Sequence, residues 1–265
     1  MLLRNVFTKS LWDARRSLLG WTLAIVAVGA MYAAFWPSMQ SPEMAKAMEA
    51  YPRGVLEALN YDDFTTAAGY LGGSVYGLLV PLLVAVFTIG AGTRAVAGDE
   101  EAGTLDLVLA HPVSRTQLAL QRFAALVVSV AAVALGLWLV MLALTGPVGF
   151  DGVTAGEFAA ANLQLAAFGI CFGALAFAVG AATGRKGLTL GLSAGIAVLA
   201  YLANGVIPMA DGLEWTRSLS PFHWYLGGDP LSRGLDAGGT LLLLGVAAAL
   251  VAIGTAVFER RDVAV

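Results

Sequence analysis

The chain is poor in the residues that most enzymes and metal sites use. It contains one cysteine, Cys171, and two histidines, His111 and His223, in 265 residues. A single cysteine excludes a disulfide framework and a thiolate metal cluster within the chain. The zinc-peptidase motif H-E-x-x-H and the phosphate-loop motif G-x-x-x-x-G-K-[ST] are both absent. The sequence therefore predicts no metal site and no ATP site in this chain, and it does not predict an enzyme.

Charge is scarce as well. Charged residues make up 12% of the chain and hydrophobic residues 58%. A soluble domain of this length needs more charge to cover its surface. The sequence pI near 5.3 gives no indication of a nucleic-acid partner. This composition indicates an integral membrane protein.

Six apolar runs reach the roughly 20 residues that a helix needs to cross a bilayer. Backbone groups in lipid must bond within their own segment, so runs of this length are predicted to be helices. The expected fold class is an all-α integral membrane protein, with a single transmembrane domain covering residues 1–265. The six predicted spans are Leu18–Trp36, Leu71–Thr93, Phe123–Leu144, Phe158–Ala182, Leu188–Met209 and Thr240–Phe258.

The basic residues predict the orientation of these spans. With the N-terminus in the cytoplasm, eleven of the fifteen Lys and Arg residues lie on the cytoplasmic side. An even number of spans returns the C-terminus to the same side. Both termini are therefore predicted to be cytoplasmic.

The first twenty residues form a separate amphipathic pattern. Leu3, Phe7, Leu11, Ala14 and Leu18 recur at helical spacing, and the basic residues lie off this stripe. The pattern predicts an interfacial helix along the inner leaflet, after which the chain turns into the first span. A cleaved signal peptide is the alternative, but no small-residue cleavage site follows the apolar run.

The polar stretch Arg94–Arg122 is the longest interruption between spans on the predicted cytoplasmic side. Its acidic residues Asp99, Glu100 and Glu101 suit the positive end of a helix dipole. The apolar spacing predicts a short helix from Asp99 to Leu109 that lies on the membrane surface.

In this predicted helix, Leu105 and Leu109 face the bundle. Leu107, together with Glu100, Glu101 and Asp106, faces outward. Pro112 ends the helix, and Ser114 begins a Ser-x-x-Gln capping box with Gln117 that starts the next one. Gly103 weakens a helix by about 1 kcal/mol relative to Ala, and close approach of another backbone is one reason to tolerate it.

Four consecutive residues with cyclic side chains precede the last span: Pro221, Phe222, His223 and Trp224. An interfacial aromatic belt is one interpretation, because Trp and Tyr favour the depth of the headgroups. The functional interpretation is a set of re-entrant helices that closes the outer end of a pathway, with these four residues as gate candidates.

Glycines repeat at every fourth position in two places, at Gly69, Gly73 and Gly77 and at Gly187, Gly191 and Gly195, and Gly169 pairs with Gly173. Small residues at this spacing let helix backbones approach closely. Packing within the chain and a seam with a second chain both remain open.

The stretch GDEEAGTLDLVLAHPVSR (residues 98–115) resembles the first cytoplasmic loop of permeases in the type-2 ATP-binding-cassette (ABC) exporter family. Ser220-Pro221-Phe222 before the last span and the charged ending Phe258-Glu259-Arg260-Arg261-Asp262 are similar to the same family. The resemblance covers nearly the whole chain. It implies a bacterial inner-membrane permease that dimerises, as two copies or with a related permease, and sits on two separate ATPase subunits that bind ATP and Mg²⁺.

The resemblance also implies that the loop helix couples the ATPase to the pathway. The coupling residues it suggests are Glu100, Glu101, Gly103, Thr104, Leu105, Asp106, Leu107, Pro112, Ser114 and Arg115. An amphipathic compound such as a drug or an antibiotic is the favoured cargo.

The sequence also bears on two other classes of protein. An intramembrane enzyme is disfavoured, because the two histidines are predicted on opposite sides of the membrane. A structural membrane subunit or an ion channel without an ATPase partner is the alternative that six spans alone allow.

Overall fold

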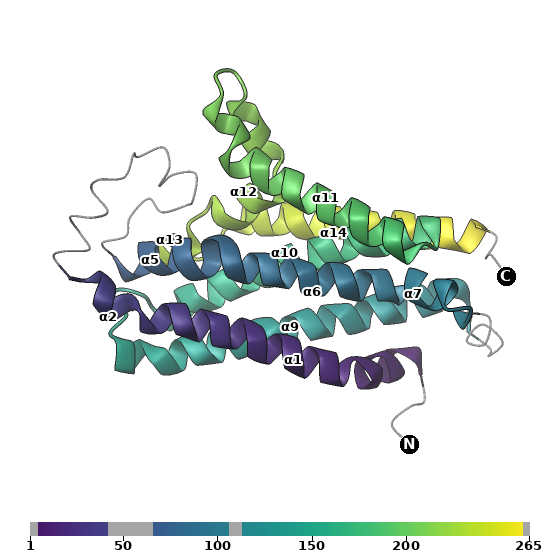
Figure 1. Ribbon diagram of the computed structural model, residues 1–265, viewed down its shortest axis with the longest axis horizontal. Helices are drawn as coiled ribbons and strands as arrows, with labels where there is room; N and C mark the ends of the chain where they lie inside the picture. The colour runs from purple at the N-terminus through teal and green to yellow at the C-terminus, as the bar shows by residue number, and fades with distance from the viewer. Residues whose placement is uncertain (1–4, 42–65, 106–112, 262–265) are drawn as a thin grey trace.

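The computed structural model describes residues 5–41, 66–105 and 113–261, which form helices joined by short turns (Figure 1). No β-strand occurs in these ranges. Six helical stretches within them are long and apolar enough to cross a membrane. The all-α membrane fold predicted from the sequence is therefore confirmed. The stretches are Val6–Met39, Ala67–Ala95, Arg115–Val148, Ala155–Thr183, Lys186–Met209 and Ala237–Arg260, and each contains one of the predicted spans.

Three of the six stretches are composite. The first joins α1 (Val6–Ala34) to α2 (Trp36–Met39), the second joins α5 (Ala67–Ser74), the π-helix η1 (Val75–Leu79) and α6 (Val80–Ala95), and the fifth joins α11 (Lys186–Gly205) to the 3₁₀ turn η2 (Ile207–Met209). The other three are α9 (Arg115–Val148), α10 (Ala155–Thr183) and α14 (Ala237–Arg260). The short elements are α7 (Ala97–Glu101), η3 (Glu214–Leu219), α12 (Pro221–Leu226) and α13 (Pro230–Arg233).

Helix α10 is the centre of the bundle and packs against α6, α9, α11 and α14. Its aromatic side chains Phe158, Phe168, Phe172 and Phe177 are fully buried. A Cβ atom built on Gly173 would lie 2.9 Å from the side chain of Leu126, and one on Gly169 would lie 2.7 Å from Val84. The Gly169–Gly173 pair is thus used for packing within the chain.

The glycines of α11 behave differently. A Cβ atom added to Gly187, Gly191 or Gly195 would meet nothing within 4 Å. These glycines are exposed, whereas Gly73 and Gly77 of the second stretch are buried. The face of α11 that carries the glycine repeat is therefore open.

The predicted turn between an interfacial helix and the first span does not occur. Helix α1 instead runs unbroken from Val6 to Ala34, and the Asn5 side chain caps its start by accepting a 2.8 Å hydrogen bond from the Thr8 N–H. No proline interrupts this segment, and a helix once nucleated propagates readily. The amphipathic stripe and the first span are two parts of one helix.

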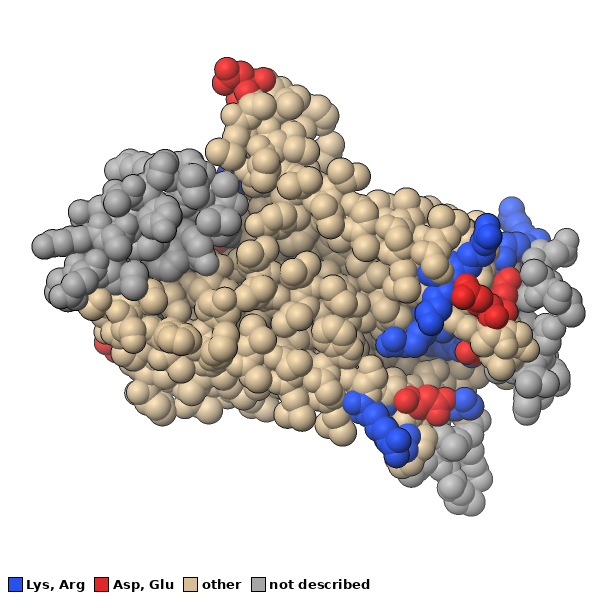
Figure 2. Space-filling model, viewed as in Figure 1, with Lys and Arg blue, Asp and Glu red and all other residues tan. Residues whose placement is uncertain are grey.

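The bundle has two chemically different ends. At one end lie α7, the beginnings of α1, α9 and α11, and the carboxyl end of α14 (Figure 1). Lys, Arg, Asp and Glu residues gather there, and most of the long apolar body carries no charge on the face shown in Figure 2. We call this the charged end. The opposite end, where α12 and α13 lie, is called the aromatic end.

Candidate functional site

Helix α7 is shorter than the predicted Asp99–Leu109 helix. It ends at Glu101, and Gly103 follows with a left-handed φ of 65°. The Gly103 N–H donates to the Glu100 carbonyl (3.0 Å) and the Thr104 N–H donates to the Asp99 carbonyl (2.9 Å). This is the Schellman pattern, which ends a helix at a left-handed glycine. The prediction of one helix across Gly103 was therefore wrong.

The left-handed turn explains why residue 103 is a glycine, and close approach of another backbone is not needed as a reason. A Cβ atom built there meets nothing within 4 Å in the chain, so the positive φ is the reason for glycine. Leu105 follows the turn and is only 2% exposed, packed in a cluster with Leu118 and Phe258. The predicted coupling residues Asp106, Leu107 and Pro112 lie outside the described residues.

Asp99 connects α7 to α9. Its carboxylate forms an ion pair with Arg122. The Arg122 guanidinium also donates a 2.8 Å hydrogen bond to the carbonyl of Ala95, in the last turn of α6. One arginine of α9 thus holds both the end of α6 and the start of α7.

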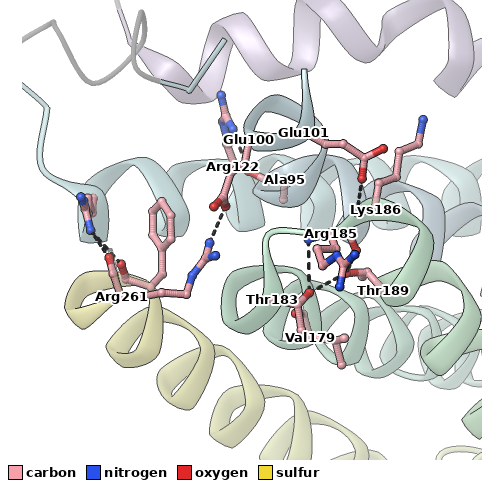
Figure 3. A network of polar contacts seen from close by, with 12 residues as sticks. Ala95, Glu100, Glu101, Arg122, Val179, Thr183, Arg185, Lys186, Thr189 and Arg261 are labelled. Atoms are coloured by element: carbon pink, nitrogen blue, oxygen red, sulfur yellow. Dashed lines mark hydrogen bonds and ion pairs between the residues drawn. The ribbon is translucent and has the colours of Figure 1, made fainter. Parts of the chain in front are cut away.

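Glu100 connects α7 to α14, and it faces inward. Its side chain is 4% exposed and forms an ion pair with Arg261 (Figure 3). The carboxylate lies against Gly184, where an added Cβ atom would be 2.5 Å from Oε1. The prediction that Glu100 faces outward was therefore wrong, because Arg261 and the space at Gly184 accommodate the carboxylate within the bundle.

Glu101 connects α7 to α11. It is exposed, as predicted, but its Oε2 accepts a 2.7 Å hydrogen bond from the Lys186 backbone N–H (Figure 3). The N-cap residue of α11, Arg185, makes no side-chain capping bond. Because the first N–H groups of a helix have no partner within it, Glu101 supplies the cap from another helix, where a carboxylate also suits the helix dipole.

Ser114 and Arg115 stand where α9 begins. The Ser114 hydroxyl accepts a 3.1 Å hydrogen bond from the Gln117 N–H, which is the bond predicted for an N-cap. The Arg115 guanidinium donates to the Arg261 carbonyl at 2.6 Å and lies over the Phe258 ring. Arg115 thereby caps the carboxyl end of α14.

Three consecutive carboxylates of α7 therefore bind three different helices. We call this set the α7 clamp, which consists of Asp99 with Arg122, Glu100 with Arg261, and Glu101 with the Lys186 N–H. A displacement of α7 acts on α9, α11 and α14 at once. The sequence prediction missed Asp99, Arg122, Gly184 and Arg261 as members of this site. One signal in the sequence could have indicated partners on other helices: the three acidic residues have no basic residue at helical spacing within α7.

The four gate candidates at the aromatic end lie together on α12 but have different surroundings. Pro221 is the first residue of α12. Phe222 is buried, and its ring packs edge-on against Phe168 at 4.8 Å. Trp224 donates to the Ser218 carbonyl at 2.7 Å.

His223 is the only one of the four that titrates. Its buried Nδ1 has no hydrogen-bond partner among the described residues. Burial and then the charge of Arg217 lower the pKa of His223 below its ordinary value, and Asp236 opposes this shift.

Tyr225 of α12 joins the aromatic end to the second stretch. In the π-helix η1 the carbonyl of residue i is bonded to the N–H of residue i+5, which for Tyr76 is Pro81, and proline has no N–H. The Tyr225 hydroxyl instead donates to this carbonyl at 3.0 Å, and both residues are buried. A contact from α12 thus satisfies the backbone group that Pro81 leaves without a partner.

The side chains that commonly bind metal ions do not cluster in the described residues. These residues contain no group of three or more His, Cys, Asp or Glu side chains that could hold a metal ion. Residues 191–195 read G-x-S-x-G, but they lie inside the continuous helix α11 rather than on the strand-to-helix turn that a nucleophile needs. The Ser193 Oγ is buried and has no hydrogen-bond partner among the described residues.

A family model described as ABC-2 family transporter protein matches residues 4–263. No curated protein matches the chain.

Proposed function

The chain belongs to the ABC-2 family of transporter proteins, and from this premise we propose that it forms the export pathway for an amphipathic compound. Membership makes it a membrane permease of an ABC transporter and implies association with an ABC ATPase. In the proposal, ATP and Mg²⁺ bind to that separate subunit and this chain hydrolyses nothing. The apolar character of the spans favours an amphipathic cargo, such as a drug or an antibiotic.

The α7 clamp is the observation that carries the proposal. A helix of five residues has little packing area of its own, yet its carboxylates bind α9, α11 and α14. A force applied to the loop 94–122 therefore reaches three membrane-spanning helices. We expect the ATPase to bind this loop, through Leu107 and Asp106 among others, and the clamp to transmit its movement.

The orientation follows from the distribution of charge. Basic residues gather at the charged end (Figure 2), which favours a cytoplasmic location by the positive-inside rule. The start of α1 and the end of α14, the first and last described helices, lie at this end (Figure 1), so both termini are proposed to be cytoplasmic. In the proposal, the charged end meets the ATPase, the aromatic end faces outward, and the membrane is the bacterial inner membrane.

A second copy of the permease is proposed to pack against α11. The open glycine face of Gly187, Gly191 and Gly195 permits close approach of another helix. The comparable glycines on α10 are already occupied within the chain. The proposed assembly is a homodimer with α11 at its seam and one ATPase beneath each permease.

The outer gate is proposed to be α12. Its Phe222 is packed in the core and its Tyr225 holds the π-helix of the second stretch. Movement of α12 therefore changes the contacts of the helix that continues into α7 at the other end.

Co-purification tests the central part of this proposal. The tagged full-length chain is isolated from its native cells in a mild detergent, its companions are identified by mass spectrometry, and ATP hydrolysis is measured. We expect an ABC ATPase in equal copy number, with hydrolysis by the complex and none by the isolated permease. Absence of an ATPase, even after chemical crosslinking in the membrane, would favour the structural-subunit or ion-channel alternative.

A matched pair of variants tests the coupling role. Leu107→Ala combined with Glu101→Ala should leave expression in the membrane unchanged and reduce ATPase association or transport, because truncation of an interface anchor costs roughly 1–2 kcal/mol. Leu105→Asp is the contrasting control, since Leu105 is buried and its replacement should destabilise the loop itself. Full activity of the double variant would show that the loop is only a connection.

A further inference from the structure

The charged end contains a cavity beside the α7 clamp, and the Asp99–Arg122 pair of the clamp forms part of its lining. Its volume is about 460 Å³, and it lies between α1, α6 and α9. Figure 2 shows a hollow at the charged end, between the start of α1 and the rest of the bundle. This volume falls within the range of small-ligand sites, roughly 300–1,000 Å³.

Of the three cationic side chains that line the cavity, one has no anionic partner among the described residues. Lys9 is paired with Asp13 at 2.6 Å, and Arg122 is paired with Asp99. Arg94, in the last turn of α6, also lines the cavity, and it makes no ion pair or hydrogen bond with any residue of the described ranges. The cavity therefore has an excess of one positive charge, located on a side chain whose donors are free.

Hydroxyl groups complete the lining. Ser10 and Ser17 face the cavity from α1, and neither has a hydrogen-bond partner among the described residues. Ser129 of α9 already donates to the Ala125 carbonyl at 2.8 Å. Free hydroxyl donors beside an unpaired guanidinium are a suitable set for an anion with several oxygen atoms.

Two aromatic rings lie next to the cavity lining. The lining residue Ser17 precedes Trp21 by one turn of α1, and the lining residue Ala91 follows Phe87 by one turn of α6; the ring centroids of Trp21 and Phe87 are 6.0 Å apart. The rings therefore lie on the side of these lining residues that is farther from the charged end. The charged and hydroxyl side chains of the lining suit a polar group.

We propose that this cavity binds a phosphate group through Arg94, with Ser10 and Ser17 as additional donors. The phosphate belongs either to the headgroup of an anionic phospholipid in the adjacent leaflet or to a free small anion. Arg94 is positioned for the lipid source, because it lies one residue from the end of a membrane-spanning stretch, at the depth where headgroups occur.

Native mass spectrometry of the full-length permease tests this site. The probes are phosphatidylglycerol, phosphatidylcholine and inorganic phosphate, each titrated into delipidated protein in a neutral detergent. We expect Arg94→Gln to weaken phosphatidylglycerol binding roughly tenfold or more, as loss of a charge-assisted hydrogen bond implies. Arg94→Lys should retain most of the binding, because it keeps the charge.

Arg16→Gln is the matched control, since Arg16 is an exposed arginine of α1 that does not line the cavity. It should bind phosphatidylglycerol like the wild type. Preference for phosphatidylglycerol over phosphatidylcholine, lost only with Arg94→Gln, supports the lipid source. Competition by millimolar inorganic phosphate without lipid retention supports a free anion. Equal binding by wild type and Arg94→Gln, or equal losses in Arg94→Gln and Arg16→Gln, would overturn the site.

Discussion

The two ends of the bundle hold their short helices by different forces. At the charged end, α7 is held by carboxylates that bind two arginines and a backbone N–H. At the aromatic end, α12 is held chiefly by rings, with Phe222 packed on Phe168, Phe172 and Tyr201. Charge-assisted hydrogen bonds are strong but depend on direction and are lost over a short displacement. Apolar packing is non-directional and tolerates sliding.

This difference suits different roles. A contact that is either made or lost can couple α7 to three helices in one state and release them in another. The rings of α12 can move as a body while they remain buried. The predictions that follow test whether the two ends differ in this way, in order of decreasing effect.

The largest effect is expected for Glu100→Ala. The change leaves Arg261 without its partner in a buried site, and breaking a buried ion pair costs roughly 3–5 kcal/mol; partial exposure of Arg261 favours the lower value. Glu101→Ala is the control within the same helix, because the exposed Glu101 loses one capping bond, which costs about 1 kcal/mol. Thermal unfolding in detergent measures both. Equal losses would contradict the inward position of Glu100.

Tyr225→Phe is the corresponding change at the aromatic end. It leaves the buried Tyr76 carbonyl without a donor, at a cost of roughly 1–3 kcal/mol. Pro81→Ala restores an N–H to the helix, so the double variant should lose less stability than the sum of the two single variants. The same unfolding measurement gives the coupling. Strict additivity would show that Pro81 is not the reason that Tyr225 bonds to this carbonyl.

Substitutions of two glycines at the charged end compare a packed position with an exposed one. Gly184→Ala places a side chain at φ 65° and against the Glu100 carboxylate, so we expect a loss of roughly 1–2 kcal/mol. Gly187→Ala lies on the open face of α11 and should change the stability of a single copy by less than about 0.5 kcal/mol. Its effect should be on dimer formation, which size-exclusion chromatography with light scattering measures. A large loss of monomer stability in Gly187→Ala would contradict an open face.

The smallest effect is a pH dependence from His223. Its pKa is lower in the folded state than in the unfolded chain, so the unfolded chain binds the proton first as the pH falls. The folded state is therefore most stable above the ordinary pKa of about 6.5 and loses stability as the pH falls below it. Unfolding temperatures at pH 7.5 and 5.5 measure this loss. His223→Gln should reduce the difference between the two temperatures, and an unchanged difference would assign it to other groups.

The sequence predicted the spans well, because an apolar run of about twenty residues has few alternatives in a membrane. It also predicted Ser114 as a helix start, since the N-cap bond joins residues three apart. Local patterns of this kind are readable from one sequence. The fold class followed from them.

The site was less predictable for two physical reasons. The apolar spacing of Ala102, Leu105 and Leu109 continues across Gly103, so it concealed the left-handed turn that ends α7. The partners of Asp99, Glu100 and Glu101 stand 23, 161 and 85 residues away. No helical periodicity connects residues at such separations, so Glu100 and Glu101, which bind the bundle, were interpreted as part of a surface facing outward.

Labelling of a single cysteine tests most directly whether α7 couples the ATPase to the aromatic end. Ser220→Cys, on a Cys171→Ser background, places a thiol at the start of α12, where Ser220 is 1% exposed and bonded to the Ala200 carbonyl. An impermeant maleimide is applied to the membrane-embedded complex with its ATPase, with and without ATP. We predict that ATP increases labelling and that Glu101→Ala abolishes the increase while the ATPase stays bound. The same ATP-driven increase in the Glu101→Ala protein would contradict it.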